Sequence, residues 1–364
     1  MKRIAYIIEG MYNSGGMERV LSVVANSLCK DYDLTVITLQ QKGREHYFKL
    51  EDDIHCHDLW IVDIADGKEI KQKLAKYLHE QHFNTVISLG GIDFYYLHSI
   101  KDGSRKIFWY HFAIDIAKTT WIGPNPSVAK RIKAEFQTWR RIYHARKYDK
   151  IVVISKADLS AWKRYTNNAM LIYNPVTISN AQPADMQSKA VISVGRLDYQ
   201  KGYDYLIDAW KVVAEKHSDW HLNIYGEGLL REKLQKQIGQ LQLTSFITIC
   251  GRVTNIEDEY TRHSIYVMSS RAEGLGLVLL EAASCGLPLV AFDCPSGPSE
   301  IIEDGKNGFL IEKVGDVQGM ADRICLLIEN TSLRNKMGGE ALGVTNKFSI
   351  SEISKRWMSL LNNM

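Results

Sequence analysis

Short apolar runs alternate with longer stretches of helical periodicity along almost the whole chain. In the first half, the apolar runs predict strands over residues 4–8, 34–39, 85–89, 106–110 and 151–154, and the helical patterns cover 17–29, 67–80, 128–147 and 156–165. This rhythm predicts a parallel sheet wrapped by helices. The pattern breaks at Asn174-Pro175 and becomes polar over residues 171–183, which predicts a linker.

The same rhythm starts again after the linker. It predicts strands over 190–195, 221–225, 246–250, 265–269 and 288–292, and helices over 203–216, 228–240, 277–285 and 317–329. Residues 346–364 then place their apolar side chains on one face of a last helix. We therefore expect an α/β protein with two doubly wound, Rossmann-like domains, 1–174 and 175–345, that face a cleft. The final helix, 346–364, should dock back on the first domain.

Composition narrows the class of protein. The chain has 364 residues, of which 45% are hydrophobic and 24% charged, as is ordinary for a soluble globular protein. The apolar run at 4–8 ends at Glu9, so it is too short for a signal peptide or a membrane span, and we expect a cytoplasmic protein. Six scattered cysteines without a C-x-x-C pair argue against a zinc site and a disulfide framework.

Positive charge is concentrated in the first half of the chain. Residues 1–175 hold 26 lysines and arginines against 19 acids, while the remainder is slightly acidic. Much of the excess lies in 128–150, where Ile132, Phe136, Trp139 and Tyr143 fall on one stripe of a basic amphipathic helix. Such a helix can lie on an anionic membrane surface, or it can pack its stripe into the core and leave its charges in water. Nucleic acid is not an expected partner, because no reader motif is present.

A glycine-rich loop follows the first predicted strand, in "IIEGMYNSGGMERVLSVVANSL". Such strand-to-helix loops usually bind phosphate through backbone N–H groups and the positive end of the helix. The loop lacks the Lys-Ser/Thr of an ATP-binding P-loop and the G-x-G-x-x-G of a dinucleotide site. What remains is a loop in which Gly15 and Gly16 allow a close approach to the backbone.

Two cations open the second domain in "VISVGRLDYQKGYDYLIDAW". Arg196 and Lys201 stand between a strand and a helix, framed by Gly195 and Gly202. A guanidinium fork and a mobile ammonium group beside a helix N-terminus form a site suited to a diphosphate.

Two glutamates frame a second glycine-rich loop in "SSRAEGLGLVLLEAASCGLPLVAF". Carboxylates such as those of Glu273 and Glu281 accept hydrogen bonds from sugar hydroxyls. Between them, the backbone N–H groups of Gly274, Leu275, Gly276 and Leu277 open a helix and can face phosphate.

These motifs together resemble a known family. The E-x7-E of Glu273 and Glu281, "GRLDYQKG" and "SGGMERV" are similar, in order and across essentially the whole chain, to the retaining nucleotide-sugar glycosyltransferases of family 4, which have the GT-B fold. The segment "DCPSGPSEII" is similar to members that assemble bacterial polysaccharides. Many members have Phe where this chain has Leu275, which leaves only the local packing of the sugar in question.

The resemblance implies roles for the residues. Arg196 and Lys201 would hold the donor diphosphate, Glu281 the ribose and Glu273 the donor sugar. The backbone of 274–277 would contact the phosphates and the sugar, and Gly15 and Gly16 would lie close to the phosphates. The family also places a histidine near the reacting sugar, and "IFWYHF" supplies His111, which would bond a sugar hydroxyl or stabilise developing charge.

The expected reaction is a retaining transfer of a hexose or N-acetylhexosamine from a nucleotide diphosphate sugar, with UDP preferred. The acceptor is a saccharide or a lipid-linked saccharide, at the inner face of the cell membrane. No metal and no further cofactor is expected, because Arg196, Lys201 and the helix N-terminus supply the positive charge, and the single D-x-D match, Asp31 to Asp33, reads as a turn. Two alternatives remain: a nucleotide-sugar 2-epimerase on the same fold and a non-catalytic sugar-binding module.

Overall fold

The chain forms two compact units in the computed structural model, which describes residues 1–121, 123, 125–178 and 182–364. Unit 1 comprises residues 1–114, 135–177 and 348–364, and unit 2 comprises residues 115–134 and 178–347. The first domain was expected to be continuous over 1–174, whereas the structure groups residues 115–134 with unit 2. Of the expected linker, 171–183, residues 179–181 lie outside the described part of the chain.

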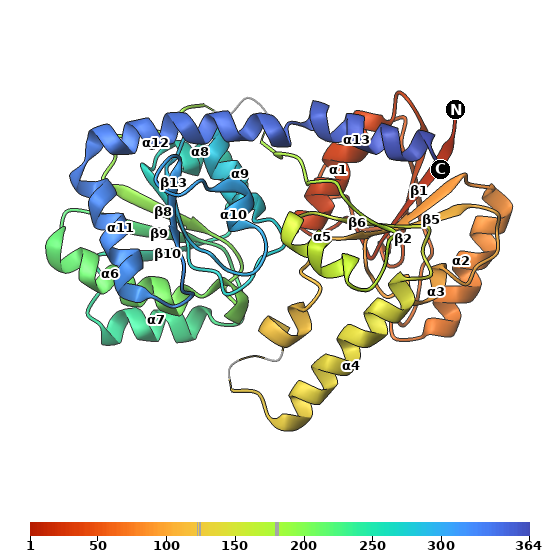
Figure 1. Cartoon of the computed structure of the whole chain (residues 1–364), viewed down its shortest axis with the longest axis horizontal. Coiled ribbons are helices and arrows are strands. Elements are labelled where there is room, and N and C mark those ends of the chain that lie inside the picture. The colour runs from red at the N-terminus through yellow and green to blue at the C-terminus, as the bar shows by residue number, and fades with distance from the viewer. Residues whose placement is uncertain (122, 124, 179–181) are drawn as a thin grey trace. The chain divides into compact units, whose positions relative to one another are not determined.

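Unit 1 is built on a seven-stranded sheet in which all neighbouring strands run parallel (Figure 1). The strand order is β3-β2-β1-β4-β5-β6-β7. The strands are β1 (Arg3–Ile8), β2 (Asp33–Thr38), β3 (His55–Asp58), β4 (Thr85–Ser88), β5 (Arg105–Tyr110), β6 (Lys150–Val153) and β7 (Ala169–Leu171). Buried apolar side chains fill the inner strands on both sides, which is why these strands read as unbroken apolar runs.

Helices cover both faces of this sheet. They are α1 (Gly16–Leu28), α2 (Gly67–Gln81), α3 (Phe94–Leu97), α5 (Lys156–Lys163), α13 (Ile350–Asn362) and the part of α4 (Val128–Ala145) that follows residue 134. One core joins strand residues such as Ile7 and Val86 to Leu74 of α2, Ile142 of α4 and Trp162 of α5.

The C-terminal helix α13 belongs to unit 1, where it lies beside α1 (Figure 1). The hydroxyl groups of Ser27 in α1 and Ser354 in α13 are 2.8 Å apart and share a hydrogen bond. Trp357 of α13 is fully buried, and its ring meets the ring of Trp109 edge-on with centroids 4.7 Å apart.

Unit 2 repeats the doubly wound plan on a six-stranded parallel sheet with the order β10-β9-β8-β11-β12-β13. Its strands are β8 (Ala190–Val194), β9 (His221–Tyr225), β10 (Ile247–Gly251), β11 (Ile265–Met268), β12 (Leu289–Phe292) and β13 (Gly308–Ile311). The predicted fold class of two α/β units with parallel sheets is thus confirmed.

The helices of unit 2 also flank its sheet (Figure 1). They are α6 (Tyr203–Lys216), α7 (Arg231–Gln240), α8 (Ile256–Thr261), α9 (Leu277–Ser284), α10 (Pro298–Ile301), α11 (Val317–Glu329) and α12 (Thr331–Val344). Trp210 of α6, Leu234 of α7 and Ile324 of α11 belong to one apolar core with sheet residues such as Val267 and Val290. Within the described residues, no helix has the length and the apolar character needed to cross a bilayer.

Helix α4 does not pack its apolar stripe into the core, which was one of the two interpretations of its sequence. Had its apolar stripe packed into the core, Ile132, Phe136, Trp139 and Tyr143 would be buried, but all four are exposed. The helix instead buries small and mixed side chains on its opposite face, among them Ala134, Thr138, Ile142 and Ala145. Periodicity alone could not reveal this, because it shows that a face is apolar without showing what covers it.

Candidate active site

The residues expected to hold the diphosphate lie where the strand order of unit 2 reverses. β8 and β11 are neighbours in the sheet but lie on opposite sides of the chain reversal. Arg196 and Lys201 follow β8, while Glu273 and the loop 274–277 follow β11. Doubly wound sheets bind ligands at the carboxyl ends of their strands at such a point. The topology therefore brings together two motifs that are about eighty residues apart in the sequence.

Gly202 allows the two loops to touch. It has a φ of +64°, and a Cβ atom at this position would lie only 2.1 Å from the carbonyl oxygen of Ser269. A larger residue would therefore be strained by its backbone angle and would collide with the neighbouring loop. The Ser269 hydroxyl donates a hydrogen bond of 3.0 Å to the carbonyl oxygen of Lys201, which fixes the register of the two loops.

Lys201 and Glu273 form the ion pair at the centre of this site. The Nζ of Lys201 is 2.7 Å from the Oε1 of Glu273, and the two side chains are only 14% and 7% exposed. The same oxygen accepts a 2.5 Å hydrogen bond from the Ser270 hydroxyl. Burial makes the two charges depend on each other, since either one alone would be costly to desolvate. The sequence assigned these residues separate ligand groups, and the structure adds that they contact each other.

Arg196 belongs to the same loop but is much more exposed. Its Nη2 is 3.3 Å from the Oδ2 of Asp198 and 3.3 Å from the Oε1 of Gln200, and 68% of its side chain is exposed. Exposed pairs of this length hold an arginine weakly. The guanidinium can therefore leave these partners for a ligand at low energetic cost.

The loop 274–277 presents a helix N-terminus. Gly276, with a φ of +84°, is the residue before α9, and no side chain caps this end of the helix. The first N–H groups of a helix have no partner within the helix, so they are available to an anion. Gly297 packs tightly on this loop, because a Cβ there would lie 2.7 Å from the carbonyl oxygen of Leu275. The backbone at Gly297 is thus in direct contact with this loop.

Glu281 lies on α9 and is almost completely buried. Its Oε2 accepts a 3.1 Å hydrogen bond from the hydroxyl of Tyr260 in α8. Tyr266 on β11 is also fully buried. Burial raises the pKa of Tyr266 well above its usual range, and the charges of both Glu273 and Glu281 raise it further.

Arg271 is a residue of this site that the sequence did not single out. It forms two parallel hydrogen bonds with the carboxylate of Asp204, at 2.9 and 2.6 Å. Its guanidinium also lies against the rings of Tyr199 and Tyr205, 4.2 and 4.1 Å from their centroids. This clamp fastens the loop after β11 to the first turn of α6. The sequence did not reveal this clamp, because an arginine, an aspartate and two tyrosines at such separations form no recognisable motif.

In unit 1, the glycine-rich loop follows β1 as predicted, and Gly15 stands directly before α1. A Cβ at Gly15 would lie 2.3 Å from the Oε2 of Glu18, so this carboxylate lies over the N-terminus of α1. Burial raises the pKa of Glu18, and a hydrogen bond with Asn13 opposes that shift. The N-terminus expected to face phosphate beside Gly15 and Gly16 thus has a carboxylate of its own chain over it.

His111 follows β5 of unit 1 and is buried. Its ring lies against Trp109, with centroids 4.6 Å apart, and its Nδ1 is 3.5 Å from the Nδ2 of Asn174. Burial lowers the pKa of His111 to about 3, so the ring is neutral at physiological pH. Within the described residues, its Nε2 has no hydrogen-bond partner. A neutral imidazole with one nitrogen unpaired is suited to bonding a hydroxyl.

The D-x-D match runs from the turn before β2 into the first residue of that strand, Asp33, which pairs with Arg3 at 3.1 Å, and Tyr32 bonds the side chain of Asn362. In the described part of the chain, no group of three or more His, Cys, Asp and Glu side chains is placed to hold a metal ion.

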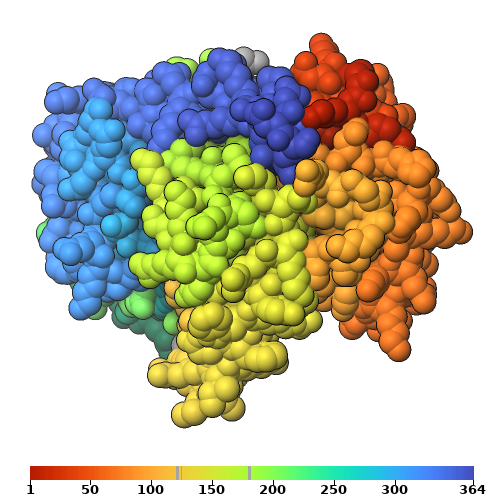
Figure 2. Space-filling view, turned by 45° about the vertical axis from the view of Figure 1, so that its right-hand side comes forward, coloured from red at the N-terminus to blue at the C-terminus, as the bar shows by residue number. Residues whose placement is uncertain are grey.

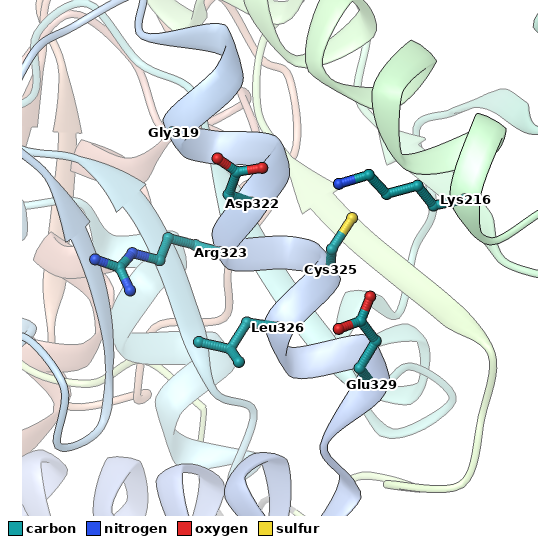
Figure 3. A pocket seen from close by; sticks show the side chains of 7 residues that line it. All are labelled: Lys216, Gly319, Asp322, Arg323, Cys325, Leu326 and Glu329. Carbon is teal, nitrogen blue, oxygen red and sulfur yellow. The ribbon is translucent and has the colours of Figure 1, made fainter.

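A separate hollow of about 490 Å³ lies between α6 and α11 (Figure 3). Its lining includes Lys216 at the end of α6 and Arg323, Cys325 and Glu329 on α11, and none of these belongs to the expected site. This hollow and the diphosphate motifs thus lie at different places on unit 2.

Comparisons with known proteins place the chain among glycosyltransferases. The model of the family "Glycosyl transferases group 1" matches residues 177–342. An uncharacterized glycosyltransferase of Haemophilus influenzae is 30% identical over 99% of this chain and 100% of its own length. The α-1,4-N-acetyl-D-galactosaminyltransferase of Campylobacter jejuni that acts on a GalNAc-containing, diphosphate-linked undecaprenol saccharide is 24% identical over 99% of this chain and 98% of its own length.

Solved structures show the same fold. A mutant of S. aureus TarM, crystallised with fondaparinux, α-GlcNAc-glycerol and UDP, covers the whole of both chains with a TM-score of 0.82 at 19% identity. Together with the full-length relative at 30% identity and the motifs at the reversal of the second sheet, this shows that the chain belongs to the group 1 glycosyltransferases, enzymes of the GT-B fold.

Proposed function

We propose that this glycosyltransferase transfers a hexose or N-acetylhexosamine from a UDP-sugar, with retention of anomeric configuration and without a metal. The acceptor is a hydroxyl group of a saccharide or lipid-linked saccharide in the synthesis of a bacterial cell-surface polysaccharide, at the inner face of the membrane. The name of the relative from Campylobacter jejuni supports a lipid-linked acceptor. The UDP crystallised with TarM supports UDP as the nucleotide of the donor.

The observation that carries the proposal is the buried Lys201–Glu273 pair beside the uncapped N-terminus of α9. In the reaction, Lys201, Arg196 and the N–H groups of 274–277 face the diphosphate as it leaves. Positive charge that is already in place where negative charge develops stabilises the transition state. These groups therefore supply what a metal ion supplies in other sugar transferases.

The remaining residues orient the donor and the acceptor. Glu273 accepts hydrogen bonds from the hydroxyls of the donor sugar, and Glu281 accepts them from the ribose. The neutral His111 bonds a sugar hydroxyl through Nε2 once the groups that bury this nitrogen have moved aside. The acceptor oxygen attacks the anomeric carbon from the face of the leaving group, the bond to the diphosphate breaks, and a phosphate oxygen takes the proton. No protein nucleophile is needed for this step, and the match to a full-length glycosyltransferase favours it over epimerisation or simple sugar binding.

The first test is the affinity for UDP, measured by isothermal titration calorimetry. The variants Lys201→Ala and Glu281→Gln should bind UDP about tenfold or more weakly, because each loses a hydrogen bond to a charged group. The matched control is Lys306→Ala, which breaks the exposed Lys306–Glu303 pair of 2.8 Å in the same unit.

Removal of Lys201 alone leaves the Glu273 carboxylate buried, which can unfold the unit. The double variant Lys201→Ala/Glu273→Gln leaves no buried unpaired charge. It replaces the single variant in the binding experiment if the single variant has a much lower melting temperature. If the folded variants bind UDP as tightly as the parent, the site is wrongly assigned. A product with inverted anomeric configuration would contradict the proposed retaining mechanism. Loss of activity on addition of a metal chelator would contradict the proposed metal independence.

A further inference from the structure

Helix α4 has two unlike faces. Ala134, Thr138, Ile142 and Ala145 are buried on one side. The other side carries what we call the apolar stripe, whose five side chains are between 56% and 72% exposed: Val128, Ile132, Phe136, Trp139 and Tyr143. They recur every three or four residues, so they form one continuous line about 22 Å long. Atoms of α4, in yellow, lie at the surface in Figure 2.

This stripe is unusual for the surface of this chain. Eleven large apolar side chains are exposed among the described residues, and five of them lie on this single helix. Scattered exposed apolar residues are normal, but a continuous line of them marks an interaction site. The stripe extends along about four turns of the helix.

Cations border the stripe. At 100° per residue, Lys133 and Arg140 lie on one side of it and Arg131 on the other, and all three are exposed. Arg146 and Lys147 extend this border beyond the last turn, and both are exposed as well. Glu135 is the one acid in the helix sequence. The partner must therefore offer an apolar layer that is edged by negative charge.

We propose that α4 inserts its apolar stripe into the surface of an anionic lipid bilayer, with its bordering cations among the lipid headgroups. A bilayer offers both layers at the right depth, because hydrocarbon lies directly beneath the anionic headgroups. A second copy of the helix would bring two rows of cations together and is disfavoured by their repulsion. A nucleic acid would satisfy the cations but would leave the apolar side chains in water. The inference rests on the proposed function for its biological role, since a lipid-linked acceptor lies at such a surface.

The geometry distinguishes insertion from a purely electrostatic contact. Attraction between exposed charges and headgroups is screened by salt, whereas burial of apolar side chains is not. Trp139 and Tyr143 have amphipathic rings of the kind that concentrates at membrane interfaces. Binding should therefore require anionic lipid yet survive in part at high salt, and the emission of Trp139 should shift to shorter wavelength.

The test uses the full chain in vesicle flotation, with phosphatidylcholine vesicles and with vesicles that also contain phosphatidylglycerol. The stripe variant, Ile132→Ser with Phe136→Ser, keeps every charge, and the border variant, Arg131→Gln with Lys133→Gln, keeps every apolar residue. Val62→Ser replaces an equally exposed apolar residue of unit 1 and is the control. A Trp139→Phe variant identifies the contribution of that tryptophan to the fluorescence.

We expect the parent and the control to float with anionic vesicles and to remain partly bound at high salt. The stripe variant should partition about tenfold less and lose all binding at high salt, and the border variant should lose its preference for anionic lipid. Parent protein that ignores lipid charge, or a stripe variant that binds as the parent does, overturns the proposal. So does a dimer, seen by light scattering, that only the stripe variant disrupts, or tight binding of an oligonucleotide in place of vesicles.

The affinity for UDP distinguishes a failure of the membrane proposal from a failure of the proposed glycosyltransferase function. The stripe lies outside the diphosphate motifs, so all α4 variants should bind UDP as the parent does. If vesicle binding fails while UDP binding persists, the membrane surface is wrong and the transferase assignment stands.

Discussion

Asp93 shows how burial sets the protonation of a side chain. It follows β4 in unit 1, is fully buried, and makes no capping hydrogen bond to α3. Burial raises the pKa of its carboxyl group to about 7, because the ionised form loses its hydration. The folded chain therefore holds a proton here under conditions in which the unfolded chain has released it.

The sign of the resulting pH dependence follows. Since the pKa is raised in the folded state, the folded chain binds the extra proton, and the free energy of unfolding falls as pH rises from 3.8 to about 7. The Asp93→Asn variant lacks this proton and should lose that part of the slope, which amounts to at most about 4 kcal/mol. Urea unfolding across this pH range measures it.

Asp52→Asn, at an exposed position of the same unit, is the control and should keep the slope of the parent. An Asp93→Asn variant whose stability follows pH as the parent does would show that Asp93 is ionised in the folded protein.

At the scale of the elements, the site depends on how two loops at neighbouring strand ends are held together. Gly202 permits the close approach, Ser269 fixes the register, and Arg271 with Asp204 fastens the loops from outside. The Lys201–Glu273 pair is the result of this arrangement. A change in backbone geometry should therefore affect ligand binding without touching a ligand group.

Gly202→Ala tests this idea. The added methyl group would meet the carbonyl oxygen of Ser269 at 2.1 Å, and the positive φ adds strain, so we expect a loss of about 1–3 kcal/mol in stability and weaker binding of UDP. Gly239→Ala in the last turn of α7 meets no atom within 4 Å and should instead stabilise the chain by up to about 1 kcal/mol. Thermal unfolding and calorimetry measure both effects. If Gly202→Ala behaves like Gly239→Ala, the two loops are not in contact.

The same scale shows what the sequence could and could not predict. The alternation of apolar runs located most of the buried strands and most of the long helices to within a few residues, since their periodicity is strong, but it missed the short strands β7 and β13. It also missed β3, whose sequence His55–Asp58 is polar because it lies at the edge of the sheet, and α12, whose pattern is interrupted by Gly338 and Gly339. The motifs named Lys201 and Glu273, but their contact depends on the strand order, which no local pattern contains.

The whole molecule couples segments that are far apart in the chain. Unit 1 is completed by α13, which follows the whole of unit 2 in the sequence. The Nζ of Lys2 donates a 2.8 Å hydrogen bond to the carbonyl oxygen of Leu361, and Trp357 covers Trp109. The stability of unit 1 therefore depends on residues close to position 364.

Trp357→Ala should destabilise unit 1 by about 3–5 kcal/mol, because it removes a fully buried aromatic side chain. Amide hydrogen exchange should show the loss of protection in peptides from residues 1–114, while peptides from 190–340 remain protected. Trp60→Ala, at a half-exposed position, is the control and should leave exchange unchanged. Equal loss of protection in both units would mean that they unfold together.

The position of α13 also has a consequence for biosynthesis. A ribosome makes every strand of unit 1 before it begins the sheet of unit 2, yet residues 348–364 follow only after unit 2 is complete. Until then, Trp109 and the apolar face of α1 lack their cover in the nascent chain. Unit 2 can thus finish folding first. A chain whose synthesis stalls near residue 347 should expose an apolar surface of unit 1 that is prone to aggregate and that chaperones can bind.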